Sequence, residues 1–193
     1  MNPTAPTISN PTVERHPDIA HILLAPDEIA GRVRQLGAQI SQDYADQDPL
    51  LVGVLKGVVP FLADLCRTIT IPFTIDFLAI CPYGAHRGRC GNVQILKDLE
   101  EPAEGRSIIL VEDIIDTGLT LHYLLRWLRQ RNPASVVICT LLDRPRRRLV
   151  DLPIVYRGFQ IPDYFVVGYG LDYREHYRHL PYIGVLRPEV YLP

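Results

Sequence analysis

The feature of this chain that most constrains its fold is a series of short, almost wholly apolar runs separated by stretches with helical spacing. The runs lie at residues 50–55, 73–80, 107–114 and 135–142. Strands with one face exposed to solvent alternate apolar and polar residues, whereas continuous apolar runs of this length indicate strands buried on both faces. Because helical stretches separate them, the runs predict βαβ units, a mostly parallel sheet and a doubly wound α/β fold.

Two stretches carry apolar residues at every third or fourth position, which places those residues on one face of a helix. One covers residues 26–46 and the other residues 56–69. A third helix is expected over residues 120–131. The apolar positions of the first two are Ile29, Val33, Leu36, Ile40 and Tyr44, then Phe61, Leu62, Leu65 and Ile69.

The length of 193 residues and a hydrophobic share of 47% fit one globular domain. Residues 1–18 are polar and proline-rich, so we expect a disordered tail there and a single domain over residues 19–193. In the last third, short β-rich runs at 154–159, 164–170 and 182–186 are broken by prolines. They indicate either edge strands or a small β-rich hood over the carboxyl end of the sheet.

The formal net charge of -2 gives the chain no general attraction to polyanions. Its one dense basic run, RPRRR at residues 144–148, favours a solvated turn over a nucleic-acid site in this acidic context. The N-terminal stretch lacks the pattern of a signal peptide, and no apolar stretch reaches the roughly 18 residues that cross a bilayer. We therefore expect a cytoplasmic protein that binds neither nucleic acid nor membranes.

Four cysteines occur, and none forms a C-x-x-C pair or has a histidine pair at zinc-finger spacing nearby. Free thiols are therefore the expectation for Cys66, Cys81, Cys90 and Cys139.

The segment that carries chemistry is VEDIIDTGLTL at residues 111–121, where an apolar strand ends in Glu112, Asp113 and Asp116. Open α/β sheets bind their ligands at the carboxyl ends of their strands. Buried carboxylates are costly unless they are partnered. Ribose hydroxyls and a divalent cation are the natural partners here, so these residue types favour a sugar-phosphate site.

The turn that follows, Thr117, Gly118, Leu119 and Thr120, opens the next helix. Taken alone, Thr-Gly-x-Thr is more often an ordinary helix cap. With three carboxylates before it, the turn predicts a cradle in which backbone N–H groups and two hydroxyls hold a phosphate. It is not a Walker loop, because it has no Gly-Lys-Ser/Thr sequence.

The VEDIIDTGLTL segment resembles the phosphoribosyl pyrophosphate-binding motif of type I phosphoribosyltransferases, in the version found in hypoxanthine phosphoribosyltransferases. Other segments match in the same order, and the resemblance covers nearly everything after about Val52. They are VLKG at 54–57, ILKDL at 95–99, LLDRP at 141–145 and IPDYFVVGYGLDYREHYRHLPYIG at 161–184.

The resemblance implies a magnesium-dependent enzyme that transfers the 5-phosphoribosyl group from phosphoribosyl pyrophosphate to a 6-oxopurine. Hypoxanthine would give inosine monophosphate, and activity on guanine stays open. The same resemblance implies a homodimer or homotetramer. It also implies that the β-rich C-terminal segment forms a hood beside the sheet.

Site roles follow from the matched positions. Glu112 and Asp113 would face the ribose hydroxyls, directly or through magnesium. Asp116 would be the general base near nitrogen 7 of the purine. The turn at residues 116–120 would hold the 5-phosphate.

The pyrophosphate would be met by Leu55, Lys56 and Gly57, which match a loop of backbone amides and a lysine. Arg178 matches a position that grips pyrophosphate, and a guanidinium fork suits that task. Asp172 matches a magnesium-binding position, together with the carboxylates of the 111–121 segment.

For the purine, Phe165 matches the residue that stacks on the base and Val166 the residue whose backbone reads its edge. Arg144 stands where the family usually has a lysine that donates to the 6-oxo group. This departure leaves base selectivity open. Arg146 is close enough in sequence to be the donor instead.

Tyr83 matches the start of a loop that closes over the reacting centre in this family. Pro82 replaces the serine that usually precedes this tyrosine, which removes a donor N–H and fixes φ. Closure of the loop is therefore expected to differ from the family pattern.

Two alternatives remain from the sequence. One is an enzyme of the same fold that acts on guanine, xanthine or adenine. The other is a non-catalytic regulator that binds RNA or nucleotides. The acidic balance and the matched Asp116, Asp172 and Arg178 weigh against the second alternative.

Overall fold

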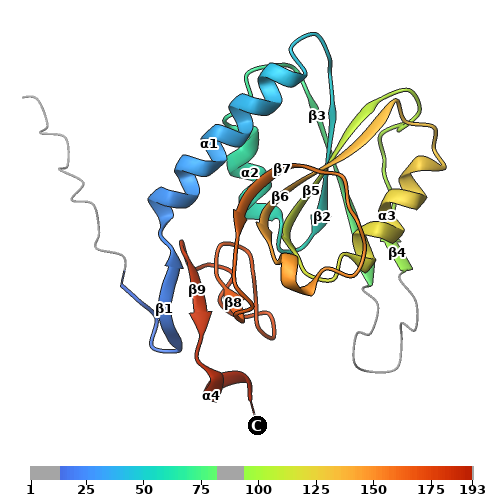
Figure 1. The fold of residues 1–193 in the computed structure, drawn as a ribbon. Helices are drawn as coiled ribbons and strands as arrows, with labels where there is room; N and C mark the ends of the chain where they lie inside the picture. Colours follow the sequence, from blue (N-terminus) through green and yellow to red (C-terminus); the bar gives the residue numbers. More distant parts are fainter. Residues whose placement is uncertain (1–13, 82–93, 193) are drawn as a thin grey trace, which may run out of the picture.

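The computed structural model describes residues 14–81 and 94–192. Its main sheet has six strands in the order β4-β3-β2-β5-β6-β7, all parallel except the β3–β4 pair (Figure 1). The mostly parallel α/β sheet predicted from the apolar runs is confirmed. The strands are β2 (Leu50–Leu55), β3 (Thr74–Cys81), β4 (Gln94–Lys97), β5 (Ser107–Ile115), β6 (Ser135–Asp143) and β7 (Ile154–Gln160).

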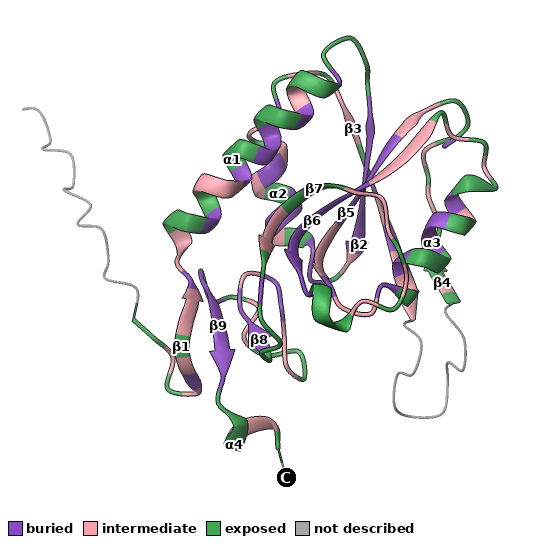
Figure 2. Ribbon diagram, viewed as in Figure 1, coloured by how far each residue is buried: buried purple, intermediate pink, exposed green. Residues whose placement is uncertain are grey.

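Helices cover both faces of this sheet, as a doubly wound fold requires. α1 (Pro26–Asp43) and α2 (Val59–Cys66) lie on one side, and α3 (Leu119–Arg129) lies on the other (Figure 1). Successive strand residues alternate between the two cores. Leu51 of β2 packs in the α1 and α2 core, whereas Leu50 belongs to the α3 core. β2, β5 and β6 are therefore buried along most of their length (Figure 2).

A second, antiparallel sheet forms a hood in the order β1-β9-β8. Its strands are β1 (Ile19–Leu24), β8 (Val166–Val167) and β9 (Ile183–Leu186), and α4 (Pro188–Tyr191) follows. A third core, with Tyr182 fully buried at its centre, holds the hood together. The two possibilities for the C-terminal third are therefore both realised, because β7 is the edge of the main sheet and β8 and β9 belong to the hood. The sequence patterns did not indicate β1.

A single turn of 3-10 helix, η1 (Pro145–Arg147), leaves β6 toward the hood. Within residues 14–81 and 94–192, no helix is long and apolar enough to cross a membrane.

The expectation of free thiols holds for Cys66 and Cys139 and is wrong for Cys81, which is disulfide-bonded. Disulfide formation depends on the spatial approach of two Cα atoms, and residue spacing does not reveal that approach.

Candidate active site

The largest part of the predicted site lies at the carboxyl ends of β2 and β5, where parallel strands end at one edge of the sheet. A cavity of about 290 Å³ opens there, and two hood residues complete its wall. The predicted residues that line it are Leu55, Lys56, Gly57, Glu112, Asp113, Asp116, Thr117, Gly118, Thr120, Asp172 and Arg178.

Glu112 and Asp113 line the cavity where burial destabilises their charged forms. Burial raises the pKa of Glu112 well above its ordinary value, and the neighbouring charge of Asp113 adds to this. One oxygen of Glu112, Oε2, is buried with no hydrogen-bond partner in the described part of the chain. Burial also raises the pKa of Asp113 to about 6, against the opposing effects of the Ile114 N–H and Arg178. Such groups need a ligand to complete them.

The turn that opens α3 depends on Gly118, whose φ of 80° lies in the left-handed region. A Cβ at this position would lie 2.9 Å from Leu152 and 3.0 Å from the Arg148 side chain. Gly118 is the N-cap of α3, and no side chain caps the helix there. The Leu119 N–H donates to the Thr117 hydroxyl oxygen at 3.4 Å, and the N–H groups that follow it in the first turn of α3 stay available to a ligand.

Two loops from distant parts of the chain meet at the other end of the cavity. A Cβ on Gly57, after β2, would lie 1.7 Å from the Asp113 carboxylate. A Cβ on Gly170, after β8, would lie 2.0 Å from the Gly57 carbonyl oxygen. Only glycines allow this approach. The Leu55–Lys56 peptide bond in the same loop is cis.

Arg178 is fixed in the hood by several acceptors. Its Nη1 donates to the Gly170 carbonyl at 2.7 Å, and its Nη2 lies 2.8 Å from Asp172 and 3.2 Å from Glu175. The second oxygen of Glu175 lies 3.3 Å from the Lys56 ammonium. One carboxylate thus links the two cations that the sequence assigned to pyrophosphate, and Glu175 was not among the predicted site residues.

A second cavity of about 270 Å³ lies beside the first, and the two have Asp113, Ile114, Asp116 and Asp172 in common. Its remaining walls come from the loop after β6 and from the hood. They are Arg144, Arg147, Phe165, Val166 and Leu171. Arg144, Phe165 and Val166, predicted to bind a purine, therefore line one space next to the predicted phosphate turn.

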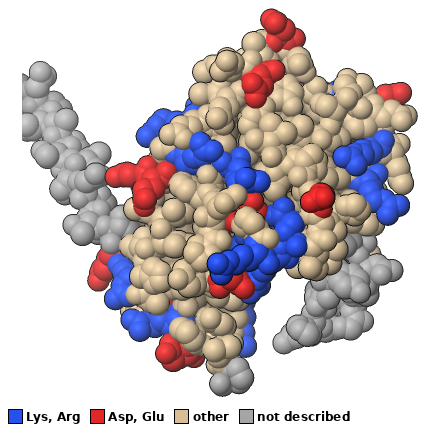
Figure 3. All heavy atoms as spheres, in the orientation of Figure 1, with Lys and Arg blue, Asp and Glu red and all other residues tan. Residues whose placement is uncertain are grey.

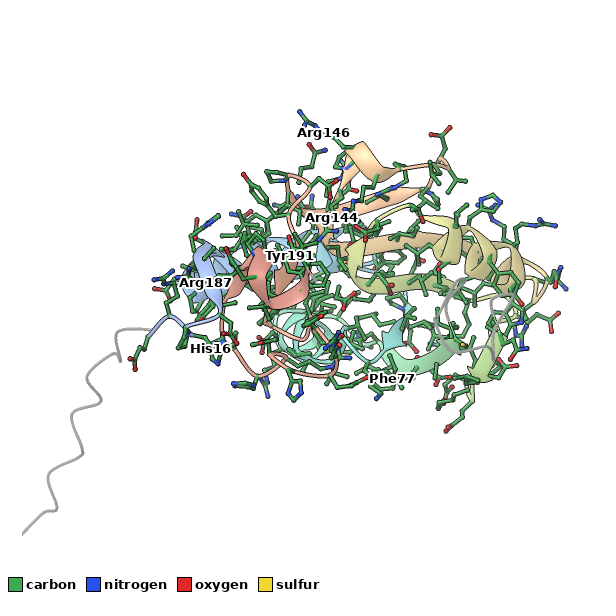
Figure 4. The ribbon with its side chains drawn as sticks, turned by 90° about the horizontal axis from the view of Figure 1, so that it is seen from below. His16, Phe77, Arg144, Arg146, Arg187 and Tyr191 are labelled. Atoms are coloured by element: carbon green, nitrogen blue, oxygen red, sulfur yellow. The ribbon has the colours of Figure 1, made fainter. Side chains whose placement is uncertain are left out.

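Arg144 is almost fully buried and pairs with Asp116 at 2.9 Å. Arg147 approaches the same carboxylate at 4.0 Å and pairs with Asp163 at 2.5 Å. Two guanidinium groups therefore face the Asp116 carboxylate. Arg146 is exposed and extends away from the body of the protein, whereas Arg144 lies inside it (Figure 4).

The basic run at residues 144–148 does not form an open positive surface. Arg148 forms an ion pair with the buried Asp143, and Arg144 and Arg147 are paired as described. Three of its four arginines therefore face carboxylates. On the face drawn in Figure 3, Lys and Arg side chains lie among Asp and Glu side chains.

A family model, the phosphoribosyl transferase domain, matches residues 21–174 of this chain. The chain belongs to the phosphoribosyltransferase family.

Named relatives place it near the purine enzymes of this phosphoribosyltransferase family. The chain is 49% identical over 174 residues to the hypoxanthine-guanine phosphoribosyltransferase of Bacillus subtilis, covering 90% of this chain and 97% of that protein. It is 48% identical over 187 residues to that of Mycobacterium tuberculosis, covering 93% of each. The structure of a Staphylococcus aureus hypoxanthine phosphoribosyltransferase matches with a TM-score of 0.86 and 44% identity, covering 91% and 96% of the two chains.

The carboxylates that line the first cavity would offer only oxygen atoms to a metal ion. Among the residues that the structure describes, no three His, Cys, Asp or Glu side chains converge closely enough to hold a metal ion by themselves. Glu112, Asp113 and Asp172 nevertheless line one cavity, and one Glu112 oxygen has no partner. Magnesium binds through few carboxylates, with phosphates and water completing its shell. The residues present fit that mode.

Several predicted and unpredicted positions remain to be placed. Tyr83 and Pro82 lie outside the described residues. Leu119, predicted in the phosphate turn, is the first residue of α3. Arg147 and Glu175 were missed. Glu175 lies within a segment that carried the resemblance, and Arg147 lies two residues after another. Their ion pairs identify these two residues as part of the site, and such pairs form only in the folded protein.

Proposed function

We propose that this protein transfers the 5-phosphoribosyl group from phosphoribosyl pyrophosphate to hypoxanthine, with magnesium, and yields inosine monophosphate and pyrophosphate. The observation that carries the proposal is the junction of two cavities at Asp113, Asp116 and Asp172. One cavity has the features of a sugar-phosphate site, and the other has an aromatic ring and a buried arginine. Two substrates seated in them would meet at the shared carboxylates.

The first cavity supports binding of the phosphate groups at its two ends. The N–H groups that follow Leu119 in the first turn of α3 are available to the 5-phosphate. Lys56 and Arg178 stand at the opposite end, where they would neutralise the leaving pyrophosphate. Bound magnesium would add further charge neutralisation there. Glu112, Asp113 and Asp172 are the residues that would hold it, directly or through ribose hydroxyls and water.

Asp116 would accept the proton from nitrogen 7 of the purine as the purine attacks carbon 1 of the ribose. Its ion pair with Arg144 orients the carboxylate at the junction of the cavities. Arg144 lines the second cavity, and its guanidinium donates one N–H to Asp116, which leaves further donors of the group for a ligand. A 6-oxo group in the second cavity would accept from one of them.

The same arginine argues for base selectivity. A guanidinium donates hydrogen bonds and accepts none, so it matches the oxygen of hypoxanthine and guanine and not the amino group of adenine. A site built around such a bond discriminates by about 10⁴ to 10⁵. We therefore expect adenine to be a negligible substrate.

The test is product formation from phosphoribosyl pyrophosphate across hypoxanthine, guanine, xanthine and adenine, each with magnesium and with excess chelator. We expect inosine monophosphate from hypoxanthine, no detectable product with chelator, and recovery when magnesium or manganese is restored. Comparable use of adenine would overturn the selectivity, and full activity in chelator would overturn the metal assignment. Absence of product with every base would overturn the proposal itself.

A non-catalytic RNA-binding regulator is not favoured, because three arginines of the basic run are engaged by carboxylates. We further propose a cytoplasmic location and a homodimer or homotetramer, both by analogy with the family.

A further inference from the structure

The ring proposed to stack on the purine is itself stacked on a residue from the C-terminal end of the chain. The rings of Phe165 and Tyr191 lie 4.7 Å apart between centroids, with an interplanar angle of 21°. Tyr173 meets the same phenylalanine edge-on, at 5.6 Å and 89°. Both are arrangements that aromatic pairs prefer.

Phe165 borders both the second cavity and Tyr191. Phe165 is 37% exposed and lines the second cavity, together with Arg144 and Val166. Tyr191 is half-buried and, within the described part of the chain, does not line that cavity. Tyr191 therefore contacts the ring from outside the cavity, and the cavity beside Phe165 stays open to a ligand.

Hydrogen bonds just before α4 tie the segment that carries Tyr191 to Phe165 and to the start of the hood. The Leu186 N–H donates to the Phe165 carbonyl at 2.9 Å, which ties the start of the C-terminal segment to Phe165 itself. The next residue, Arg187, donates from its N–H to Asp18 at 2.9 Å and from its Nε to Pro17 at 2.8 Å. α4 begins directly afterward and ends at Tyr191. The position of the tyrosine ring is thus coupled to the hood.

We propose that Tyr191 is a positioning residue for the purine, whose ring holds the Phe165 ring in the orientation needed for base stacking. The inference rests on the proposed function. An exposed phenylalanine supported on neither face would lose side-chain freedom when a base binds. A ring already held by Tyr191 and Tyr173 has lost that freedom on folding, which favours base binding without touching the base.

The experiment compares the full-length protein with Tyr191→Ala, Tyr191→Phe and a control, Leu192→Ala. Leu192 is the next residue and is 58% exposed. In Tyr191→Ala we expect KM for hypoxanthine and Kd for inosine monophosphate to rise roughly three- to ten-fold, as for the loss of one aromatic pair. KM for phosphoribosyl pyrophosphate, Kd for pyrophosphate and kcat should stay within a factor of two of wild type by the same estimate. Tyr191→Phe should restore base affinity, and Leu192→Ala should have no effect.

Three results would overturn the inference. An unchanged KM for hypoxanthine in Tyr191→Ala would show that the stack has no influence on the base. A lower KM would show that the tyrosine competes with the base for Phe165. Parallel losses for both substrates, with a lowered Tm, would show a structural role alone. Failure of the wild-type protein to use hypoxanthine would instead overturn the proposed function, so the two failures are distinguishable.

Discussion

Asp116 stands where the two cavities join, with Arg144 at 2.9 Å on one carboxylate oxygen and Arg147 at 4.0 Å from the other. Its position at the end of β5 could be predicted, because three carboxylates after an apolar strand mark a ligand-binding edge. Its arginine partners could not, because they come from the loop after β6 and meet Asp116 only in the folded protein.

The role proposed for Asp116 predicts a specific defect in Asp116→Asn. Asparagine keeps the shape and still accepts a hydrogen bond from Arg144, but it does not take up a proton near neutral pH. We expect kcat to fall by roughly a hundred- to ten-thousand-fold. Steady-state assays give kcat, and calorimetric titration should find phosphoribosyl pyrophosphate still bound. Near-normal turnover would place the general base elsewhere.

The role of Arg144 is tested by replacing its guanidinium, which only donates hydrogen bonds, with the amide of glutamine, which also accepts them. Arg144→Gln should lose most of its kcat/KM for hypoxanthine, because the shorter, neutral amide replaces the charged donor to the 6-oxo group and the ion pair with Asp116 is lost. Arg146→Gln is the matched control, since Arg146 is exposed and extends away from the cavity (Figure 4). Wild-type kcat/KM in Arg144→Gln, or an equal loss in both variants, would contradict the role given to Arg144.

The strands of the main sheet that follow apolar or β-rich runs were predicted closely, including β3 and β7, which are mostly half-buried or exposed. β2, β5 and β6 match the apolar runs to within one residue at each end. α2 begins at Val59, later than the helical stretch suggests, because residues 55–57 form the loop that carries Lys56. β1 was missed because its partner β9 lies far away in sequence and no local pattern marks the pairing.

The loop after β8 and the loop after β2 act together through Glu175, which links Lys56 and Arg178. Hydrogen bonds from Arg178 and Lys56 lower the pKa of Glu175, so the group is an anion where a pyrophosphate is expected. Pyrophosphate must displace it, which costs the existing ion pairs. Glu175→Gln should therefore bind pyrophosphate roughly three- to five-fold more tightly, the effect of one exposed charge pair.

Calorimetric titration of magnesium pyrophosphate measures this effect. Glu104→Gln, which removes an exposed carboxylate elsewhere on the surface, should leave the affinity unchanged. Weaker binding in Glu175→Gln would mean that the glutamate orients the two cations for the ligand rather than competing with it.

At the scale of the whole molecule, the site lies between the main sheet and the hood. The main sheet supplies the carboxylates and the phosphate turn, and the hood supplies Asp172, Arg178 and Phe165. Apolar patterning predicted the main sheet, because its strands are read directly from continuous runs. The hood's contribution came from the family resemblance, since short strands broken by prolines carry little periodicity. Its aromatic backing by Tyr191 depends on tertiary packing alone.

Burial of carboxylates in this site lowers the free energy of unfolding, and the contribution of Asp113 can be measured. Burial raises its pKa from 3.8 to about 6, so folding favours the protonated form. Below about pH 4 Asp113 is largely protonated in both the folded and the unfolded protein, so it does not lower the free energy of unfolding. The loss of stability grows as the pH rises from about 4 to about 6 and is constant above about 6. Asp113→Asn, which keeps an acceptor for the Ile114 N–H, should therefore be more stable than the wild type at pH 8 and equal to it near pH 4.

The gain at pH 8 should be about 1–3 kcal/mol, since one pKa unit corresponds to about 1.4 kcal/mol and the Asp113 attraction to Arg178 is lost. Urea unfolding of the ligand-free protein at the two pH values measures it, and Asp46→Asn, at an exposed carboxylate, should show no such pH-dependent difference. The same variant should bind phosphoribosyl pyrophosphate more weakly, because the ribose and metal lose a carboxylate. A variant less stable at pH 8 than the wild type would mean that Arg178 and the ligand-free site already compensate the Asp113 charge.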